Sequence, residues 1–228
     1  MKGRDIEQRM RLVVNDADGV RWTDDELALW INDACRFIVM LRPDSVSRNA
    51  EFTCVAGTKQ SIADMSPKGL RLLDVIRNSP NGRAVRLVDR ETMDTVRPDW
   101  HAAQGSTTIR NYIFDNRDPT TFYTWPPAAV GAKLELLYAP EPVEITAAQL
   151  DGVDLSVPSI YMDPAVNYAL SRAYGKDAAG AKNIQLAAGY RQAAAEALGA
   201  KVKVDALFSP DLNSPGGSPS AATTAGGV

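Results

Sequence analysis

The stretch Trp22-Thr23-Asp24-Asp25-Glu26-Leu27 decides the fold of the N-terminal part of this chain, because it combines the signals that begin an α-helix. The Thr23 hydroxyl can accept from a free N–H of the first turn, and Glu26 can reach back to the N–H of the capping residue. Trp22 and Leu27 flank this capping box at the spacing of a hydrophobic staple, and the acids suit the helix dipole. We therefore expect a helix that begins after Thr23.

This helix has an apolar face and a clear end. Its apolar residues recur at helical spacing, and Pro43 stops it. The members of that face are Leu27, Trp30, Ile31, Ala34, Ile38 and Leu41. Residues 4–15 carry a similar face and are followed by a turn at 16–19. Residues 1–45 are therefore predicted to form a helical hairpin.

The pattern changes to short alternating segments after Pro43, which is typical of strands. We expect a β module with its loop connection over residues 46–158, antiparallel throughout. A dense turn at 78–82 predicts that 84–88 pairs back on 70–77 as a hairpin, and 60–62 is expected to pair back on 50–55. Asp89 is expected to cap a short helix that stops before Pro98. The remaining expected strands are 109–114, 121–125 and 133–138.

Helices resume over residues 159–204. Asp163 is expected to be an N-cap, with Pro164 at the first helical position. A second, alanine-rich helix is expected over 181–198, with Ile184 and Leu198 on its packed face. The predicted fold class is α+β: an antiparallel bundle of the N- and C-terminal helix pairs, an inserted antiparallel β module, and an extended C-terminal tail.

The tail, residues 205–228, consists mostly of Pro, Gly, Ser, Ala and Thr. Such a segment cannot bury enough apolar surface to order itself. We expect it to dock on another subunit or a partner protein. The expected contact residues are Leu207, Phe208, Pro210 and Leu212.

Composition excludes several classes of protein. The net charge of −3 argues against a wholly electrostatic nucleic-acid binder. No apolar run reaches the roughly 20 residues that span a bilayer, and the first residues do not resemble a signal peptide, so we expect no membrane contact and folding in a cytoplasm. The two cysteines, Cys35 and Cys54, are predicted to be small buried hydrophobes rather than a disulfide framework.

No segment has the pattern of a catalytic or metal site, and no cofactor is expected. The chain has one histidine, His101, in an expected loop, and it lacks a Gly-x-Ser-x-Gly elbow. The acidic turn at 16–19 fails the register of a calcium loop, because Val14 would fall on the first ligand position. A second acidic loop at 151–154 is interpreted in the same way, and the Gly-rich segment at 215–218 lacks the lysine of a phosphate loop.

Aromatic and basic residues alternate near residue 112. Arg110, Tyr112 and Phe114 would share one face of a strand, with Arg117 close by. The preferred interpretation is the edge of a sheet core, and base stacking on a nucleic acid is the alternative.

Several motifs, in their order and spacing, resemble the head-to-tail adaptor proteins of tailed bacteriophages, also called head–tail connector or tail-tubular-A-like proteins. The resemblance covers residues 20–195 and leaves out the tail after 205. The motifs are Trp22 to Leu27 with Trp30 and 32–34, Ser79 to Arg83, 88–90, 98–100, Phe122 to Pro127, 134–138, and Tyr161 to Asp177.

The resemblance implies a structural protein without enzymatic activity. It implies a homo-oligomeric ring, usually a dodecamer, between the portal protein and the tail nozzle or tail tube protein. Genomic double-stranded DNA would pass through the lumen without sequence specificity. The protein would be made in the host cytoplasm and reside in the virion, at the head–tail junction. A C-terminal extension would dock on a neighbour or on the portal.

Two other functions remain open from the sequence. One is a virion tail protein with a carbohydrate-binding β module, which would expose Trp100, Tyr123 and Trp125 in a groove. The other is a cell-wall hydrolase that uses two carboxylates distant in the chain.

Overall fold

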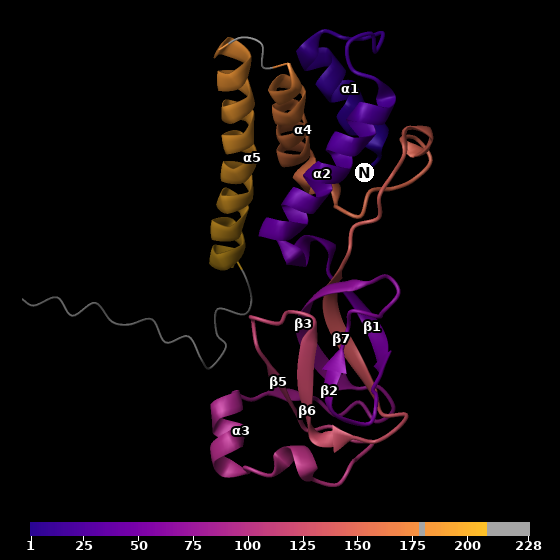
Figure 1. Cartoon of the computed structure of the whole chain (residues 1–228), viewed down its shortest axis with the longest axis vertical. Coiled ribbons are helices and arrows are strands. Elements are labelled where there is room, and N and C mark those ends of the chain that lie inside the picture. Colours follow the sequence, from indigo (N-terminus) through magenta and orange to yellow (C-terminus); the bar gives the residue numbers. More distant parts are fainter. Residues whose placement is uncertain (178–180, 209–228) are drawn as a thin grey trace, which may run out of the picture.

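The computed structural model describes residues 1–177 and 181–208, and for residues 200–208 it describes the backbone. The protein is α+β, with four long helices at one end and two sheets at the other (Figure 1). The helices are α1 (Gly3–Val14), α2 (Asp24–Leu41), α3 (Arg90–Val96), α4 (Met162–Lys176) and α5 (Ala181–Phe208). Short 3₁₀ turns lie at Pro43–Val46, Trp100–Ala102, Ala147–Gln149 and Ser159–Tyr161. The strands are β1 (Arg48–Thr53), β2 (Gly57–Ser61), β3 (Gly69–Asn78), β4 (Arg86–Leu87), β5 (Asn111–Phe114), β6 (Thr121–Ala128) and β7 (Lys133–Pro140).

Helix α2 begins as its sequence predicts. The Thr23 hydroxyl accepts from the Glu26 N–H at 3.4 Å, and the Glu26 carboxylate accepts from the Thr23 N–H at 3.4 Å. Trp22 and Leu27 are both buried. The helix ends at Leu41, and Pro43 opens the following 3₁₀ turn. The capping box, the buried staple and the proline stop are therefore confirmed.

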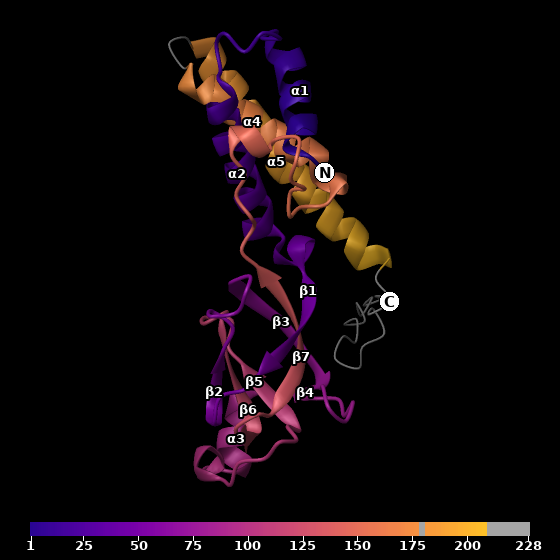
Figure 2. The same cartoon turned by 90° about the vertical axis from the view of Figure 1, so that its right-hand side faces the viewer.

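Helix α4 lies at the centre of the helical part and contacts α1, α2 and α5 (Figure 2). Its small residues Ala165, Ala169 and Ala173 are fully buried, which lets the neighbouring helices approach closely. The rings of Phe37 and Tyr168 stack between α2 and α4 at a centroid distance of 4.6 Å. These contacts join helices from the two ends of the chain into one apolar core.

The connection that follows β7 also packs into the helical core, where Ile145, Leu150, Leu155 and Val157 are buried. Asn32 of α2 holds it in place. Its side-chain amide donates to the Ile145 carbonyl at 2.8 Å, and its oxygen accepts from the Ile145 N–H at 3.0 Å. A buried side chain thus satisfies both backbone groups of a residue in a loop.

The strands form two sheets with the orders β1-β7-β3 and β2-β6-β5-β4. In β7 the alternate residues Leu134, Leu136 and Tyr138 are buried, as expected for a strand with one face on a core. They share that core with residues of both sheets. The other members are Phe52, Cys54, Ile62, Leu72, Val75, Val85, Ile109, Tyr112, Phe122, Ala128 and Ala132.

One predicted strand pairing is wrong, and a second holds only in part. Strand β2 pairs with β6, not with β1, and β1 pairs with β7. The chain does return on β3 after the 78–82 turn, through an antiparallel bridge between Arg77 and Ala84 and a 3.2 Å bond from the Val85 N–H to the Ile76 carbonyl. Strand β4 itself, however, runs parallel to β5. The module is therefore not antiparallel throughout. Local turn signals favour neighbours in sequence, whereas burial of both sheets on one core favours the observed long-range pairs.

The C-terminal helices also differ from expectation. Helix α4 begins at Met162 with Tyr161 as its N-cap, so Asp163 is not the cap. Pro164 lies inside the first turn, where its missing N–H has no helical partner to lose. Helix α5 continues to Phe208, ten residues beyond the predicted end at 198, and Ile184 is exposed rather than packed.

Both cysteines are buried, as the sequence predicts, and both are free thiols. Burial raises the pKa of Cys35 to about 12 and that of Cys54 to about 12. We expect neither thiol to react with a maleimide in the folded protein at pH 8, because reaction requires the thiolate. Mass spectrometry should find two modifications after unfolding in guanidinium and none before it; modification of the native protein would contradict the burial.

Candidate assembly surfaces

The turn between α1 and α2 is organised by Asp16, whose side chain is buried. Its carboxylate accepts from the N–H groups of Val20, Arg21 and Trp22 at 2.9 to 3.1 Å. Those bonds give the Asp16 carboxylate a structural role, which is to close the turn between the two helices. The second acidic loop is also structural, because Asp151 accepts from Arg4 and Asp154 pairs with Lys2.

Asp16 makes the stability of this turn depend on pH. Burial alone would raise the pKa of Asp16, but the three backbone donors and Arg11 lower it below its ordinary value of 3.8. The charged form therefore stabilises the folded state above that value, and this contribution is lost as the pH falls through the lower folded pKa. We expect the difference in melting temperature between the native protein and Asp16→Asn to shrink below about pH 4. A difference that stays constant from pH 7 to pH 3 would contradict this assignment.

His101 lies in the 3₁₀ turn Trp100–Ala102 after α3, in a connection between elements as the sequence predicts. Its Nδ1 is 2.8 Å from the Thr58 hydroxyl, and its ring stacks on Trp100. Trp100 is buried and donates its indole N–H to Asp94 at 2.8 Å. Arg97 lies over the ring of Trp125. Tyr123 and Trp125 are partly exposed, and Trp125 lines a surface hollow of about 370 Å³ together with Trp100 and Arg97. Tyr123 lines a different hollow, so the three aromatic side chains are not exposed together in one groove.

The Arg110–Phe114 segment packs on the sheet core as predicted, but β5 lies between β6 and β4 and is not an edge strand. Tyr112 is buried, and its hydroxyl donates to Asp74 at 2.8 Å. Phe114 packs against the same core.

Carboxylates gather at one cleft of about 640 Å³ between α3 and β5, but most have structural partners. Asp89 caps α3, and Asp94 holds Trp100. Arg117 lowers the pKa of Asp115 to about 2. A general acid needs the opposite shift, so Asp115 is not suited to that role.

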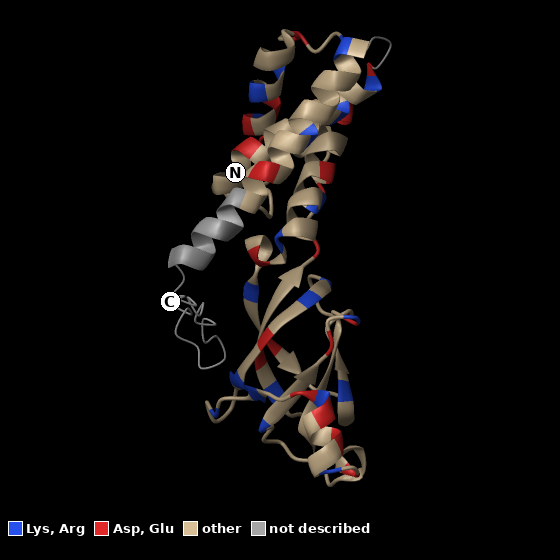
Figure 3. Cartoon of the chain, turned by 90° about the vertical axis from the view of Figure 1, so that its left-hand side faces the viewer, with Lys and Arg blue, Asp and Glu red and all other residues tan. Residues whose placement is uncertain are grey.

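The part of the chain that the structure describes contains no group of three or more His, Cys, Asp or Glu side chains placed to hold a metal ion. Within the same residues, no helix has the length and hydropathy needed to cross a membrane. Basic and acidic residues are interspersed along the helices (Figure 3).

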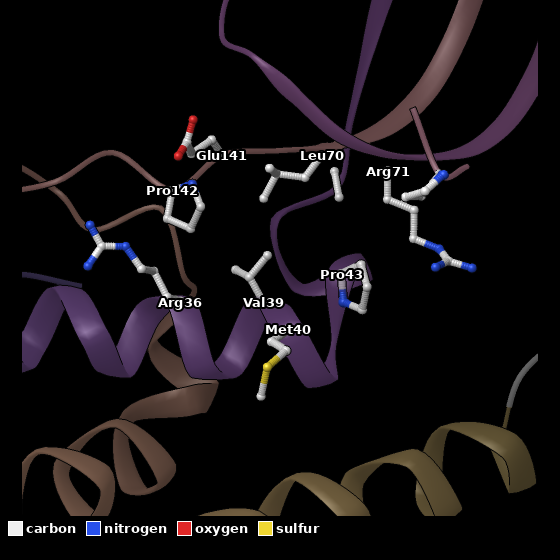
Figure 4. Close-up of a pocket in the computed structure, with 10 residues that line it drawn as sticks. Arg36, Val39, Met40, Pro43, Leu70, Arg71, Glu141 and Pro142 are labelled. Atoms are coloured by element: carbon white, nitrogen blue, oxygen red, sulfur yellow. The ribbon is translucent and has the colours of Figure 1, made fainter. Parts of the chain in front are cut away.

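One apolar groove lies where α2 meets the strands and encloses about 310 Å³ (Figure 4). Val39 and Leu70 line it, and Met40 stands at its edge with 68% of its surface exposed. Arg36, Arg71 and Glu141 add charges to the lining. An exposed methionine beside apolar residues is typical of a protein-binding surface.

A second groove, here called the cationic groove, lies among α2, α4 and α5 and encloses about 520 Å³. Its positive side chains are Arg172, Lys176 and Arg191, and Trp30 supplies an apolar wall. Its remaining members are the small residues Ser171, Gly175, Ala187 and Ala188. No local sequence motif predicts this groove, because its residues come from three helices that are far apart in the chain.

Of the four predicted tail contact residues, two lie in α5 and two lie beyond its end. Leu207 and Phe208 are the last two residues of that helix, so the segment 205–208 is helical rather than extended. Pro210 and Leu212 lie outside the described residues. Residues 205–208 therefore belong to α5 and not to an extended tail.

Comparison with known protein families identifies the family of this chain. A family model described as the SU10 adaptor protein matches residues 1–215. The match extends ten residues past 205, so the segment up to 215 is part of the family pattern, contrary to the sequence expectation. No curated protein matches the chain. Because the family model covers most of its length, the chain belongs to the SU10 adaptor protein family, which indicates a structural adaptor of a bacteriophage.

Proposed function

We propose that this protein is a head-to-tail adaptor that forms a ring, usually dodecameric in such adaptors, between the portal protein and the tail nozzle or tail tube protein. The ring would extend the channel for double-stranded DNA and would act without catalysis. The observation that carries the proposal is the family match over residues 1–215. The long molecule with a helical part at one end and a β part at the other suits a subunit that contacts one neighbour at each end (Figure 1).

The proposal assigns different tasks to different parts of the chain. The four long helices would form the bundle that carries the subunit, with the β module inserted between the two helix pairs. Each copy would offer one surface to the next in a heterologous contact, which closes into a ring when the rotation fits. The two grooves described above are candidate surfaces for such contacts.

Light scattering tests this function most directly. The full chain is measured alone and then with the purified portal ring of the same phage. We expect a defined complex whose mass corresponds to a ring of adaptor copies on the portal. If no complex forms at any molar ratio of adaptor to portal, the proposal is overturned and a different tail protein is favoured.

The C-terminal tail is proposed to strengthen this assembly through Leu207, Phe208, Pro210 and Leu212. Deleting residues 209–228 leaves every buried core residue in place, so we expect an unchanged melting temperature. We expect the affinity for the portal to fall by about tenfold or more, which corresponds to roughly 1.4 kcal/mol. Replacement of 213–228 by a Gly/Ser segment of equal length is the control, and equal portal binding by the deleted and complete chains would remove the tail from the interface.

A further inference from the structure

We infer that the cationic groove of one copy binds the segment around Asp211 of a neighbouring copy. This inference rests on the proposed ring and names the receptor for its tail. Arg172 in the groove pairs with Asp33 at 3.0 Å, and Lys176 pairs with Glu26. Arg191 has no carboxylate partner among the described residues, and its guanidinium lies 5.5 Å from the Phe37 ring and 5.3 Å from the Tyr168 ring. The groove therefore retains a positive charge that is held in position on two aromatic rings.

The groove has room for a side chain of a peptide. A Cβ atom added at Gly175 would meet nothing within 4 Å, and the facing α5 positions are Ala187 and Ala188. Packed helices leave a narrow trough, because their axes lie about 8–10 Å apart. The chemistry of the site therefore fits a carboxylate with an apolar neighbour.

The sequence beyond α5 offers one such pair. Asp211 is the one charged side chain in residues 209–228, and Leu212 beside it is the one leucine. In the groove, the Asp211 carboxylate would accept from the Arg191 guanidinium while Leu212 covers Trp30. Charge-assisted bonds of this kind are about twice as strong as neutral ones.

Geometry requires that the segment come from another copy. Arg191 lies 17 residues before Phe208 on the same helix, which is about 26 Å at 1.5 Å per residue. Asp211 follows Phe208 by three residues, which reach about 10 Å when fully extended. Asp211 therefore cannot reach the groove of its own chain, and the contact would link each copy to the next.

Disulfide trapping in the full-length chain tests this contact. Cysteines are placed in the groove and in the segment, as Ala188→Cys with Leu212→Cys, and the protein is mildly oxidised both alone and bound to the portal ring. Cys35 and Cys54 do not interfere, because both are buried. We expect a ladder of covalent multimers on a non-reducing gel. The matched control is Val130→Cys with Leu212→Cys, because Val130 is 83% exposed in the β6–β7 turn.

Charge reversal adds a second test. Arg191→Glu in the trapping variant should lower the yield of cross-linked multimers about tenfold. Adding Asp211→Arg should restore that yield, because the groove and the segment of every copy then carry opposite charges again. Any of four results would overturn the inference. The groove and control pairs could give equal ladders, or no ladder could form with or without the portal. The disulfide could also form within one chain, or join the groove cysteine to the portal. If the wild-type chain binds the portal but the trapping variant gives no selective ladder, this inference fails and the proposed function stands. If the trapping variant gives the ladder but the wild-type chain does not bind the portal, the proposed function fails.

Discussion

Replacing Arg11 with alanine should lower the free energy of unfolding by about 3 kcal/mol, because it removes one partner from a largely buried ion network. The Arg11 guanidinium pairs with Glu7 and with Asp24 at 2.6 Å, and it donates to the carbonyls of Asp16 and Trp22. The Glu7 side chain is 4% exposed. Without Arg11, Glu7 depends on Arg4 alone, and the turn between α1 and α2 loses its central donor.

Urea denaturation of the full chain measures this change. Arg9→Ala is the matched control, because Arg9 is exposed on the same helix, and its effect should stay within about 0.5 kcal/mol. A loss below about 1 kcal/mol for Arg11→Ala would mean that the network does not hold the helical hairpin together.

The second large effect is expected at Asn78, which is fully buried at the end of β3. Its amide donates to the carbonyls of Arg83 at 2.9 Å and Ile109 at 2.8 Å, and its oxygen accepts from the Ile109 N–H at 2.7 Å. One side chain thus joins β3, the 78–83 turn and the segment before β5. Asn78→Ala leaves three backbone groups without this partner, so we expect a loss of about 3 kcal/mol.

Asn49→Ala serves as its control, because Asn49 is exposed on β1 and makes a single side-chain bond of 3.4 Å to Glu135. Its effect should be within about 0.5 kcal/mol. Thermal unfolding of both variants, followed by near-ultraviolet circular dichroism of the buried tryptophans, distinguishes them. Equal melting temperatures for the two variants would show that the Asn78 bonds are not needed.

The resemblance seen in the sequence anticipated the family, because its motifs are local. The capping box of α2, the turn at 78–82 and the Asp89 cap each depend on residues within a few positions of one another. The same reasoning placed both cysteines in cores and rejected the calcium loop. The grooves could not be found in this way, because Trp30, Arg172 and Arg191 become neighbours when α2, α4 and α5 pack together.

By itself the sequence determined where most helices begin, which segments are strands and that the protein is α+β, because those features depend on capping, periodicity and turns. Only the tertiary structure decided that β1 pairs with β7, that β4 runs parallel to β5 and that α5 continues to Phe208. Strand partners are selected by the burial of two sheets on a common core, and a long helix is stabilised by packing on a neighbour such as α4. Strand pairing and helix packing both depend on contacts between residues far apart in the chain, so local sequence patterns do not predict them.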